Sequence, residues 1–192
     1  LTFAMSIKDE TELDLMKKSS VLANKVMKHG FVKKVEKIID SEDPITHEKL
    51  AEYVESILEG KLMDSSACLV PTQLARSADP SKIGLKVPPD DAEQCYSPII
   101  QSGGKYDLKV SAQSSSDKLS HDIIMVSLGA RYKNYCSNIA RTFLVDPPKK
   151  VSEIYGVLLE VQEACLAAMK PGHQLKSVYK AAVDYLKDRK GY

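Results

Sequence analysis

The residues with the clearest potential for chemistry lie in residues 122–145, which read DIIMVSLGARYKNYCSNIARTFLV. Both ends of this stretch are apolar and β-branched, which is typical of buried strands. We expect Gly129 to end the first strand and a polar hairpin tip to fall within residues 131–134. This hairpin would place Ser127 and Asn138 roughly opposite each other. Because cross-strand Cβ atoms lie about 5 Å apart, the two side chains could share one ligand or metal ion.

The donor chemistry of this pair is poor for a hydrolytic metal centre. Two divalent ions about 3.5–4 Å apart require anionic oxygen ligands. Ser127 offers a neutral hydroxyl and Asn138 a neutral amide. The carboxylate of Asp122 lies five residues before Ser127, so strand alternation directs it to the opposite face. By itself the pair is an ordinary polar pair in a hairpin, and we predict no catalytic residue, no metal and no cofactor.

The residues around this pair resemble the first metal-binding hairpin of the pita-bread metallopeptidases, the group of methionine aminopeptidase, prolidase and creatinase. In that family two metal-binding aspartates fall on the positions of Ser127 and Asn138, whose separation (138 − 127 = 11) matches the family spacing. The resemblance therefore implies that the hairpin is kept while both metal-binding carboxylates are replaced. The other matching residues are Gly129, Ala130, Tyr135, Ser137, Arg141, Thr142 and Phe143.

A second motif narrows the resemblance to one branch of this fold. Residues 95–104, CYSPIIQSGG, are expected to form a strand and a Gly-Gly turn, followed by an extended piece at residues 106–110. With the hairpin, this motif is similar to the large subunits of the FACT histone chaperone, in their aminopeptidase-like region. The similarity is strongest over residues 95–147. It implies the first half of a pita-bread fold, an α+β (α/β) arrangement with helices packed on an antiparallel sheet.

The resemblance implies a function without catalysis: a nuclear, chromatin-bound histone chaperone that reorganises nucleosomes during transcription, replication and repair. The implied partners are core histones, as the central tetramer or the flanking dimer, and an HMG-box-type subunit bound through other regions. Nucleic acid is expected only indirectly, through nucleosomes, and no membrane is expected. The cleft of the ancestral peptidase implies a groove for a histone tail, with His121, Tyr135 and Arg141 as candidate contact residues.

The remaining chain must position this hairpin, and its periodicity predicts helices on both sides. In residues 1–60 we expect one helix from Asp9 to a stop at Gly30, and a second directly after it. A third is expected after the capping residue Thr46, with His47 at the surface.

The other parts of the chain differ in regularity. Residues 61–93 are expected to be an irregular excursion with a short strand at 67–70. Residues 94–146 contain the strands and the hairpin, and residues 147–190 contain two helices.

The composition excludes several classes of protein. Of the 192 residues, 43% are hydrophobic and 28% charged, which is ordinary for a water-soluble domain. The net charge of +1 shows no excess of basic residues of the kind that binds nucleic acid. The lysines at positions 33, 34, 37 and 49 are interspersed with acidic residues, which is typical of a solvent-exposed helix face. The four cysteines are scattered, so we read them as reduced thiols.

Two alternative functions follow from the same fold. The first is an active metallo-aminopeptidase or prolidase-like enzyme, which would have to bind metal without the two carboxylates. The second is a nucleic-acid-binding relative of the pita-bread fold, against which the balanced charge argues.

Overall fold

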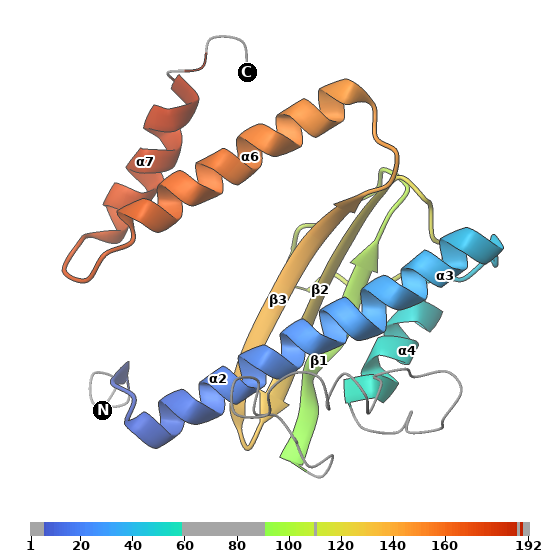
Figure 1. The fold of residues 1–192 in the computed structure, drawn as a ribbon, viewed down its shortest axis with the longest axis horizontal. Coiled ribbons are helices and arrows are strands. Elements are labelled where there is room, and N and C mark those ends of the chain that lie inside the picture. Colours follow the sequence, from blue (N-terminus) through green and yellow to red (C-terminus); the bar gives the residue numbers. More distant parts are fainter. Residues whose placement is uncertain (1–5, 59–90, 110, 188, 190–192) are drawn as a thin grey trace, which may run out of the picture. The chain divides into compact units, whose positions relative to one another are not determined.

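The computed structural model describes residues 6–58, 91–109, 111–187 and 189. The chain divides into two compact units, residues 1–145 and residues 146–192, and each is described by itself (Figure 1). The strand expected at residues 67–70 lies outside the described residues.

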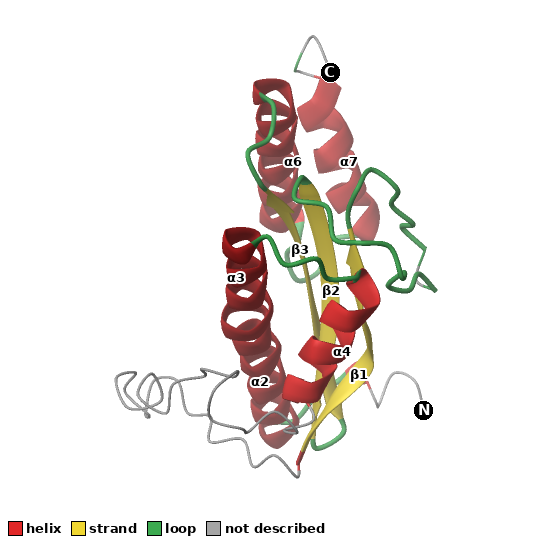
Figure 2. Cartoon of the chain, turned by 90° about the vertical axis from the view of Figure 1, so that its right-hand side faces the viewer, coloured by secondary structure: helices red, strands yellow, loops and turns green. Residues whose placement is uncertain are grey.

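The first unit is a three-stranded antiparallel sheet with helices on one face (Figures 1 and 2). The strands lie in the order β1 (Ala92–Gln101), β2 (Ile123–Tyr132) and β3 (Tyr135–Leu144). The covering layer consists of α2 (Glu10–Lys25), η1 (Val26–Val32), α3 (Lys33–Ser41) and α4 (His47–Leu58). This arrangement confirms the predicted fold class. Strand β1 begins two residues before the boundary expected at residue 94.

The core lies between this helical layer and every second residue of β2. Ile124, Val126, Leu128 and Ala130 are all buried, as period-two alternation requires of one sheet face. The helices fill the space above them with apolar side chains, among which Phe31 is the largest and is 1% exposed. The helical residues of this core are Ala23, Val26, Met27, Phe31, Val35, Ile38, Leu50, Ala51, Val54 and Leu58.

The expected stop at Gly30 is wrong, because the helix continues through it as the π-helical segment η1. Gly30 instead allows α4 and η1 to approach each other closely. A Cβ built on Gly30 would lie 2.9 Å from Cδ1 of Ile57, so the missing side chain lets α4 pack against η1. The rule that glycine ends helices is local, and here a tertiary contact overrides it.

The start of α4 is capped as predicted but is not at the surface. The Thr46 hydroxyl accepts a hydrogen bond from the amide of Lys49 at 3.2 Å. His47, expected at the surface, is 3% exposed. Its backbone amide donates to the carbonyl of Asp117 at 3.1 Å, so the loop between β1 and β2 folds over it. That long-range contact explains why the position in the sequence gave no sign of burial.

The hairpin is longer than expected. Strand β2 runs through Gly129 to Tyr132, and the turn consists only of Lys133 and Asn134, whose φ angles are 45° and 72°. Two consecutive positive φ angles define the turn type that best fits the twist of a two-residue hairpin. The expected end of the strand at Gly129 is therefore wrong.

The extended piece expected at residues 106–110 is not a strand over residues 106–109, which lie in the loop between β1 and β2. Side chains fix this loop against the strand ends. The hydroxyl of Tyr106 donates to the carbonyl of Ile123 at 2.8 Å, and the side chain of Gln101 accepts from the amide of Asp107 at 2.8 Å.

The second unit consists of two helices, α6 (Lys149–Ala168) and α7 (Leu175–Lys187), in the region where two helices are expected. Gly172, at φ 81°, turns the chain between them. The hydroxyl of Tyr185 on α7 donates to the carboxylate of Glu160 on α6 at 2.5 Å. Among the helices of the described residues, none has the length and apolarity needed to cross a bilayer.

Candidate functional site

The sheet of the first unit has a second face, opposite the helices, which we call the open face. It carries Ser127 and Gly129 from β2, Asn138 and Ala140 from β3, and Tyr96 from β1. Asn138 and Ala140 are exposed, whereas Ser127 is half-buried. The polar residues of interest therefore lie on a surface that is accessible along β3.

The register places Ser127 and Asn138 diagonally on this face. Ser127 pairs with Ala140, and Asn138 pairs with Gly129. Diagonal neighbours on one face have Cα atoms about 7–8 Å apart, so the expectation that the two residues lie opposite each other is wrong by one pair. The cause is the position of the turn, whose centre at Lys133 and Asn134 lies one residue later than the centre of the tip expected within residues 131–134.

The Ser127 hydroxyl is engaged by a tyrosine. The hydroxyl of Tyr96 lies 2.8 Å from Oγ of Ser127, so the two groups share a hydrogen bond. A Cβ built on Gly129 would lie 2.6 Å from Cε1 of Tyr96 and 2.9 Å from Cβ of Cys95. Gly129 thus makes room for the Tyr96 ring, which reaches across β2 towards Ser127.

These residues do not fit a two-metal centre. The two side chains at the expected metal positions are neutral, and one is hydrogen-bonded to Tyr96. The nearest carboxylate in sequence, that of Asp122, accepts a hydrogen bond from the amide of Gly103 at 3.3 Å. Across the ranges that the structure describes, no three or more His, Cys, Asp or Glu side chains gather into a potential metal site. The geometry thus supports no step through a bound metal.

The three candidate contact residues are not brought together with the Ser127–Asn138 pair. Tyr135 pairs with Tyr132 and Arg141 pairs with Val126, so both lie on the helix-covered face. His121 is exposed in the loop before β2.

Each of the two residues on the covered face has a local partner. The hydroxyl of Tyr135 donates to Glu12 of α2 at 2.6 Å, and this hydrogen bond is the main reason why the pKa of Glu12 is lowered. The guanidinium of Arg141 donates to the carbonyl of Ala140 at 2.7 Å.

Sequence reasoning missed two features of the open face. One is Tyr96, for which the available signal was a glycine inside a strand pattern, since such glycines often mark close approaches. The other is the proximity of Cys95 and Cys136, which are far apart in the sequence. Burial and the hydrogen bond with the Cys136 thiol raise the pKa of Cys95 to about 11. Both thiols are free.

A buried polar cluster lies where α4 meets the loop between β1 and β2. The imidazole of His47 contacts Oγ of Ser102 through Nε2 at 2.7 Å and Oγ of Ser115 through Nδ1 at 3.1 Å. Burial lowers the pKa of His47, and the charge of Asp117 offsets part of this effect. The neutral imidazole joins three segments of the first unit and is structural in its contacts.

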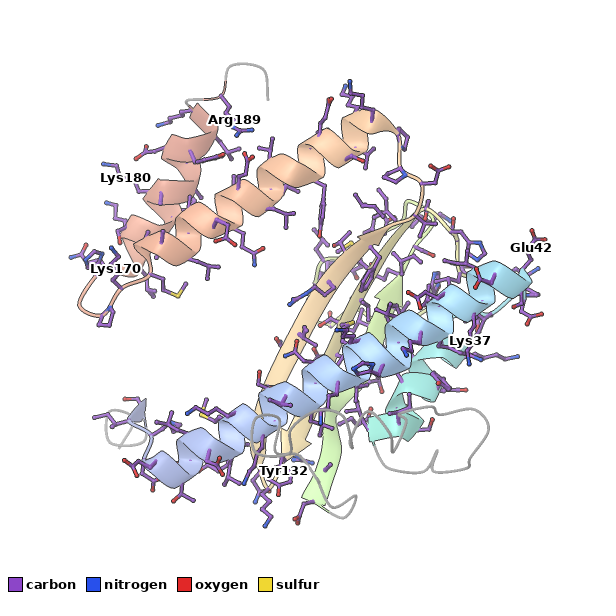
Figure 3. The ribbon with its side chains drawn as sticks, viewed as in Figure 1. Lys37, Glu42, Tyr132, Lys170, Lys180 and Arg189 are labelled. Carbon is purple, nitrogen blue, oxygen red and sulfur yellow. The ribbon has the colours of Figure 1, made fainter. Side chains whose placement is uncertain are left out.

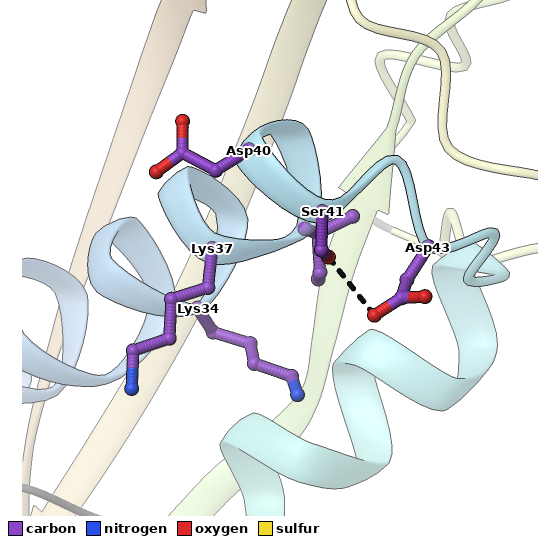
Figure 4. A pocket seen from close by; sticks show the side chains of 6 residues that line it. Lys34, Lys37, Asp40, Ser41 and Asp43 are labelled. Carbon is purple, nitrogen blue, oxygen red and sulfur yellow. Dashed lines mark hydrogen bonds between the residues drawn. The ribbon is translucent and has the colours of Figure 1, made fainter.

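A shallow hollow of about 430 Å³ lies at the end of α3 (Figure 4). Its lining mixes basic and acidic side chains, and the hydroxyl of Ser41 donates to Asp43 at 2.9 Å. The ammonium group of Lys34 lies 5.2 Å from the ring centre of Tyr53. The hollow is built by the helical layer and is separate from the open face. Its lining residues are Lys34, Lys37, Ile38, Asp40, Ser41 and Asp43.

Several known proteins with similar sequences are named as subunits of the FACT complex. The chain is 40% identical over 187 residues to "FACT complex subunit SPT16" of Oryza sativa subsp. japonica, and this match covers 96% of this chain and 16% of that protein. It is 37% identical over 188 residues to the protein of the same name from Dictyostelium discoideum, and this match covers 98% of this chain and 16% of that protein. The chain therefore spans about a sixth of the length of these curated relatives.

Solved structures agree with this similarity. The N-terminal domain of FACT complex subunit SPT16 from Cicer arietinum superposes with a TM-score of 0.79 at 39% identity, over 95% of this chain and 39% of that chain. The prolidase from Pyrococcus furiosus superposes with a TM-score of 0.65 at 24% identity, over 97% of this chain and 45% of that chain, and shows the shared fold.

The predicted resemblance is thus confirmed at the level of sequence and of fold. The sequence model of metallopeptidase family M24 matches residues 14–192, which include the hairpin and all the helices of the second unit. The chain belongs to metallopeptidase family M24, and within it resembles the N-terminal domains of FACT complex subunit SPT16.

Proposed function

We propose that this chain is part of a non-catalytic, peptidase-like module of a nuclear histone chaperone, and that it contributes to nucleosome reorganisation by binding histones. The observation that carries the proposal is the similarity to proteins named FACT complex subunit SPT16 over nearly the whole chain. The neutral pair Ser127 and Asn138 supports the absence of catalysis, because a hydrolytic metal centre needs anionic ligands there.

The surface that we assign to histones is the open face, along β3. Strand β3 is at the edge of the sheet formed by the described strands, and Asn138 and Ala140 on it are exposed. An extended peptide can add to such an edge through main-chain hydrogen bonds, while side chains on one face select its sequence. A histone tail is a segment of this kind. The HMG-box-type partner subunit is assigned to other regions of the whole protein.

The first experiment is a titration of the 192-residue chain with the central histone tetramer, the flanking histone dimer and their tail peptides, at two salt concentrations. Screening weakens contacts that depend on charge alone, so saturable binding at the higher salt indicates specific docking. Absence of binding at high micromolar concentration would remove histone contact from this part of the protein.

A matched pair of variants tests where histones bind. Ala140→Arg places a long charged side chain on the open face opposite Ser127, and we expect it to weaken binding at least tenfold. Ala167→Arg makes the same change at an exposed position of α6 and should leave the affinity unchanged. Equal affinity of both variants would place the histone contact away from the open face.

An active peptidase is the second candidate function, because the family match itself is to metallopeptidases. It predicts stoichiometric divalent metal in the purified protein and cleavage of an X-Pro peptide that a chelator abolishes. We expect neither, since the open face offers a hydroxyl and an amide where the fold's metal centre requires carboxylates.

A further inference from the structure

The outward side of the α2–η1–α3 helix is strongly basic, although the net charge of the chain is only +1. Residues 15–35 contain six lysines and His29 but no aspartate or glutamate. The apolar residues of this segment face the sheet, so the lysines gather on the other side. Acids lie at both ends of this segment, where Asp14 pairs with Lys18 and Glu36 is exposed, and the overall charge therefore conceals a basic stretch between them.

The π-helical segment aligns the central lysines. Eight residues of straight α-helix would separate Lys25 and Lys33 by about 80° around the helix axis. The segment η1, which lies between them, has i→i+5 geometry and takes up about one extra residue per turn. Lys25 and Lys33 are therefore oriented as if they were seven residues apart in an α-helix, which places them within about 20° of one another around the helix axis.

The pKa of His29 is consistent with this alignment of the central lysines. Its pKa is lowered first by burial and then by the positive charges of Lys33, Lys28 and Lys25. The charges of three lysines from α2, η1 and α3 thus act on one imidazole. Lys28 and Lys33 are exposed, and Lys25 is half-buried.

These three lysines lack acidic partners within the part of the chain that the structure describes. The ion pairs found there involve other cations, such as Lys18 with Asp14 at 2.7 Å. Lys17 and Lys37, both exposed, lie about two turns before Lys25 and one turn after Lys33. Lys17 is about 80° from Lys25 around the axis of α2, so it borders the central lysines on one side. Lys37 is labelled on α3 in Figure 3. We call Lys17, Lys25, Lys28, Lys33 and Lys37 the lysine face.

We propose that the lysine face binds the phosphate backbone of duplex DNA without reading its sequence. The band from Lys17 to Lys37 covers 20 residue steps, or about 30 Å of helix, which matches about nine base pairs. Its cations are all lysines, which act as point charges on phosphates, whereas base reading favours bidentate side chains such as arginine.

Two competing ligands fit this surface less well. Single strands require exposed aromatic side chains for stacking, and the aromatic residue of this segment, Phe31, is 1% exposed. An acidic peptide would gain affinity from apolar anchor sites, but the exposed positions between the lysines are polar, such as Ser20 and Asn24. This DNA contact is on the helical layer, whereas the proposed histone contact is on the opposite face of the sheet.

The test is a titration of a fluorescent 20-base-pair duplex of arbitrary sequence with the 192-residue chain at several salt concentrations. The five lysines of the lysine face predict a slope of about −4.5 for log K against log[salt], and two sequences should bind equally. The triple variant Lys25→Gln/Lys28→Gln/Lys33→Gln should lose at least tenfold in affinity and most of the slope, while its circular dichroism stays helical.

The matched control is Lys170→Gln/Lys176→Gln/Lys180→Gln, which removes three exposed lysines of the second unit and changes the net charge equally. It should bind DNA like the parent chain. An equal loss of DNA affinity in both variants would show that only the net charge of the chain matters, and it would overturn the proposal. Displacement of the duplex by polyglutamate at equal charge concentration would assign the lysine face to acidic peptides instead. The histone titration of the first triple variant is expected to be unchanged.

Discussion

The hydroxyl of Tyr96 lies 2.8 Å from Oγ of Ser127, and the Tyr96 ring packs over the Cα of Gly129. Strand β1 thus supplies the residue that covers Ser127, one of the two positions expected from the family resemblance to correspond to metal ligands. The Ser127 hydroxyl thus has a partner within the protein. The open face is therefore a packed protein surface around Ser127.

Tyr96→Phe removes this hydrogen bond while it keeps the ring. Because Ser127 is only half-buried and water can replace the partner, we expect a loss of about 0.5–1.5 kcal/mol in the stability of the sheet. Hydrogen exchange of peptides from β2, followed by mass spectrometry, measures this loss locally. Tyr179→Phe, at a side chain that is 72% exposed on α7, is the control and should change nothing. Unchanged protection of β2 in Tyr96→Phe would contradict the hydrogen bond.

Gly129→Ala is expected to destabilise the first unit by about 1–3 kcal/mol, the usual cost of overpacking. The new methyl would lie 2.6 Å from the Tyr96 ring and 2.9 Å from Cβ of Cys95, and neither is a flexible side-chain end. Urea unfolding measures the effect. Gly156→Ala in α6 meets open space and should stabilise its helix by about 0.5–1 kcal/mol. A neutral or stabilising effect of Gly129→Ala would show that the close packing at Gly129 is absent.

Mild acid is expected to destabilise the first unit through His47. Burial lowers the pKa of His47 in the folded state, so between about pH 6.5 and that lower value the unfolded chain binds more protons than the folded one. Stability therefore falls as pH falls through this window. The pKa of His29 is lowered too, so the informative quantity is the difference between the parent chain and His47→Gln. Melting curves from pH 7.5 to pH 5 should show a smaller loss in the variant, and parallel curves would rule out this role of His47.

Cys95 and Cys136 are expected to differ sharply in reactivity, although their thiols are neighbours. A pKa of about 11 keeps Cys95 protonated at neutral pH, and the thiolate is the form that alkylating reagents attack. Cys136 is exposed. With iodoacetamide at pH 7.5, peptide mapping should show Cys136 modified well before Cys95. In Cys136→Ala, Cys95 should react faster, since the hydrogen bond that helps to raise its pKa is lost. Equal rates for the two thiols in the parent chain would refute the contact.

The sequence predicts what periodicity and local chemistry control. The apolar stripe of α2, the cap at Thr46 and the two strands of the hairpin all follow from patterns within about 15 residues. The predictions at Gly30 and Gly129 failed for one shared reason. Both glycines look like local stops, but each accommodates a side chain from another element: Ile57 for Gly30, and Tyr96 for Gly129. Such contacts join residues more than 25 positions apart, and no local rule contains them.

The candidate site was predictable only in part. The family pattern pointed to Ser127 and Asn138. That both side chains are neutral follows from residue type alone. Their diagonal arrangement depends on where the turn is centred, and a shift of this centre by one residue changes every pair. The burial of His47 depends on a loop more than 50 residues further along the chain, so its position at a helix start favoured the surface.

The π-helical segment η1 gives this part of the chain room to lose one residue without losing its packing. Because the segment takes up about one extra residue, deleting one residue within Val26–Val32 would let the helix relax to α geometry while α3 keeps its rotation about the helix axis relative to α2. Val35 and Ile38 would then stay in the core, and Lys33 would stay on the same side of the helix as Lys25. A second deletion would rotate α3 by about 100° and turn both apolar residues out of the core.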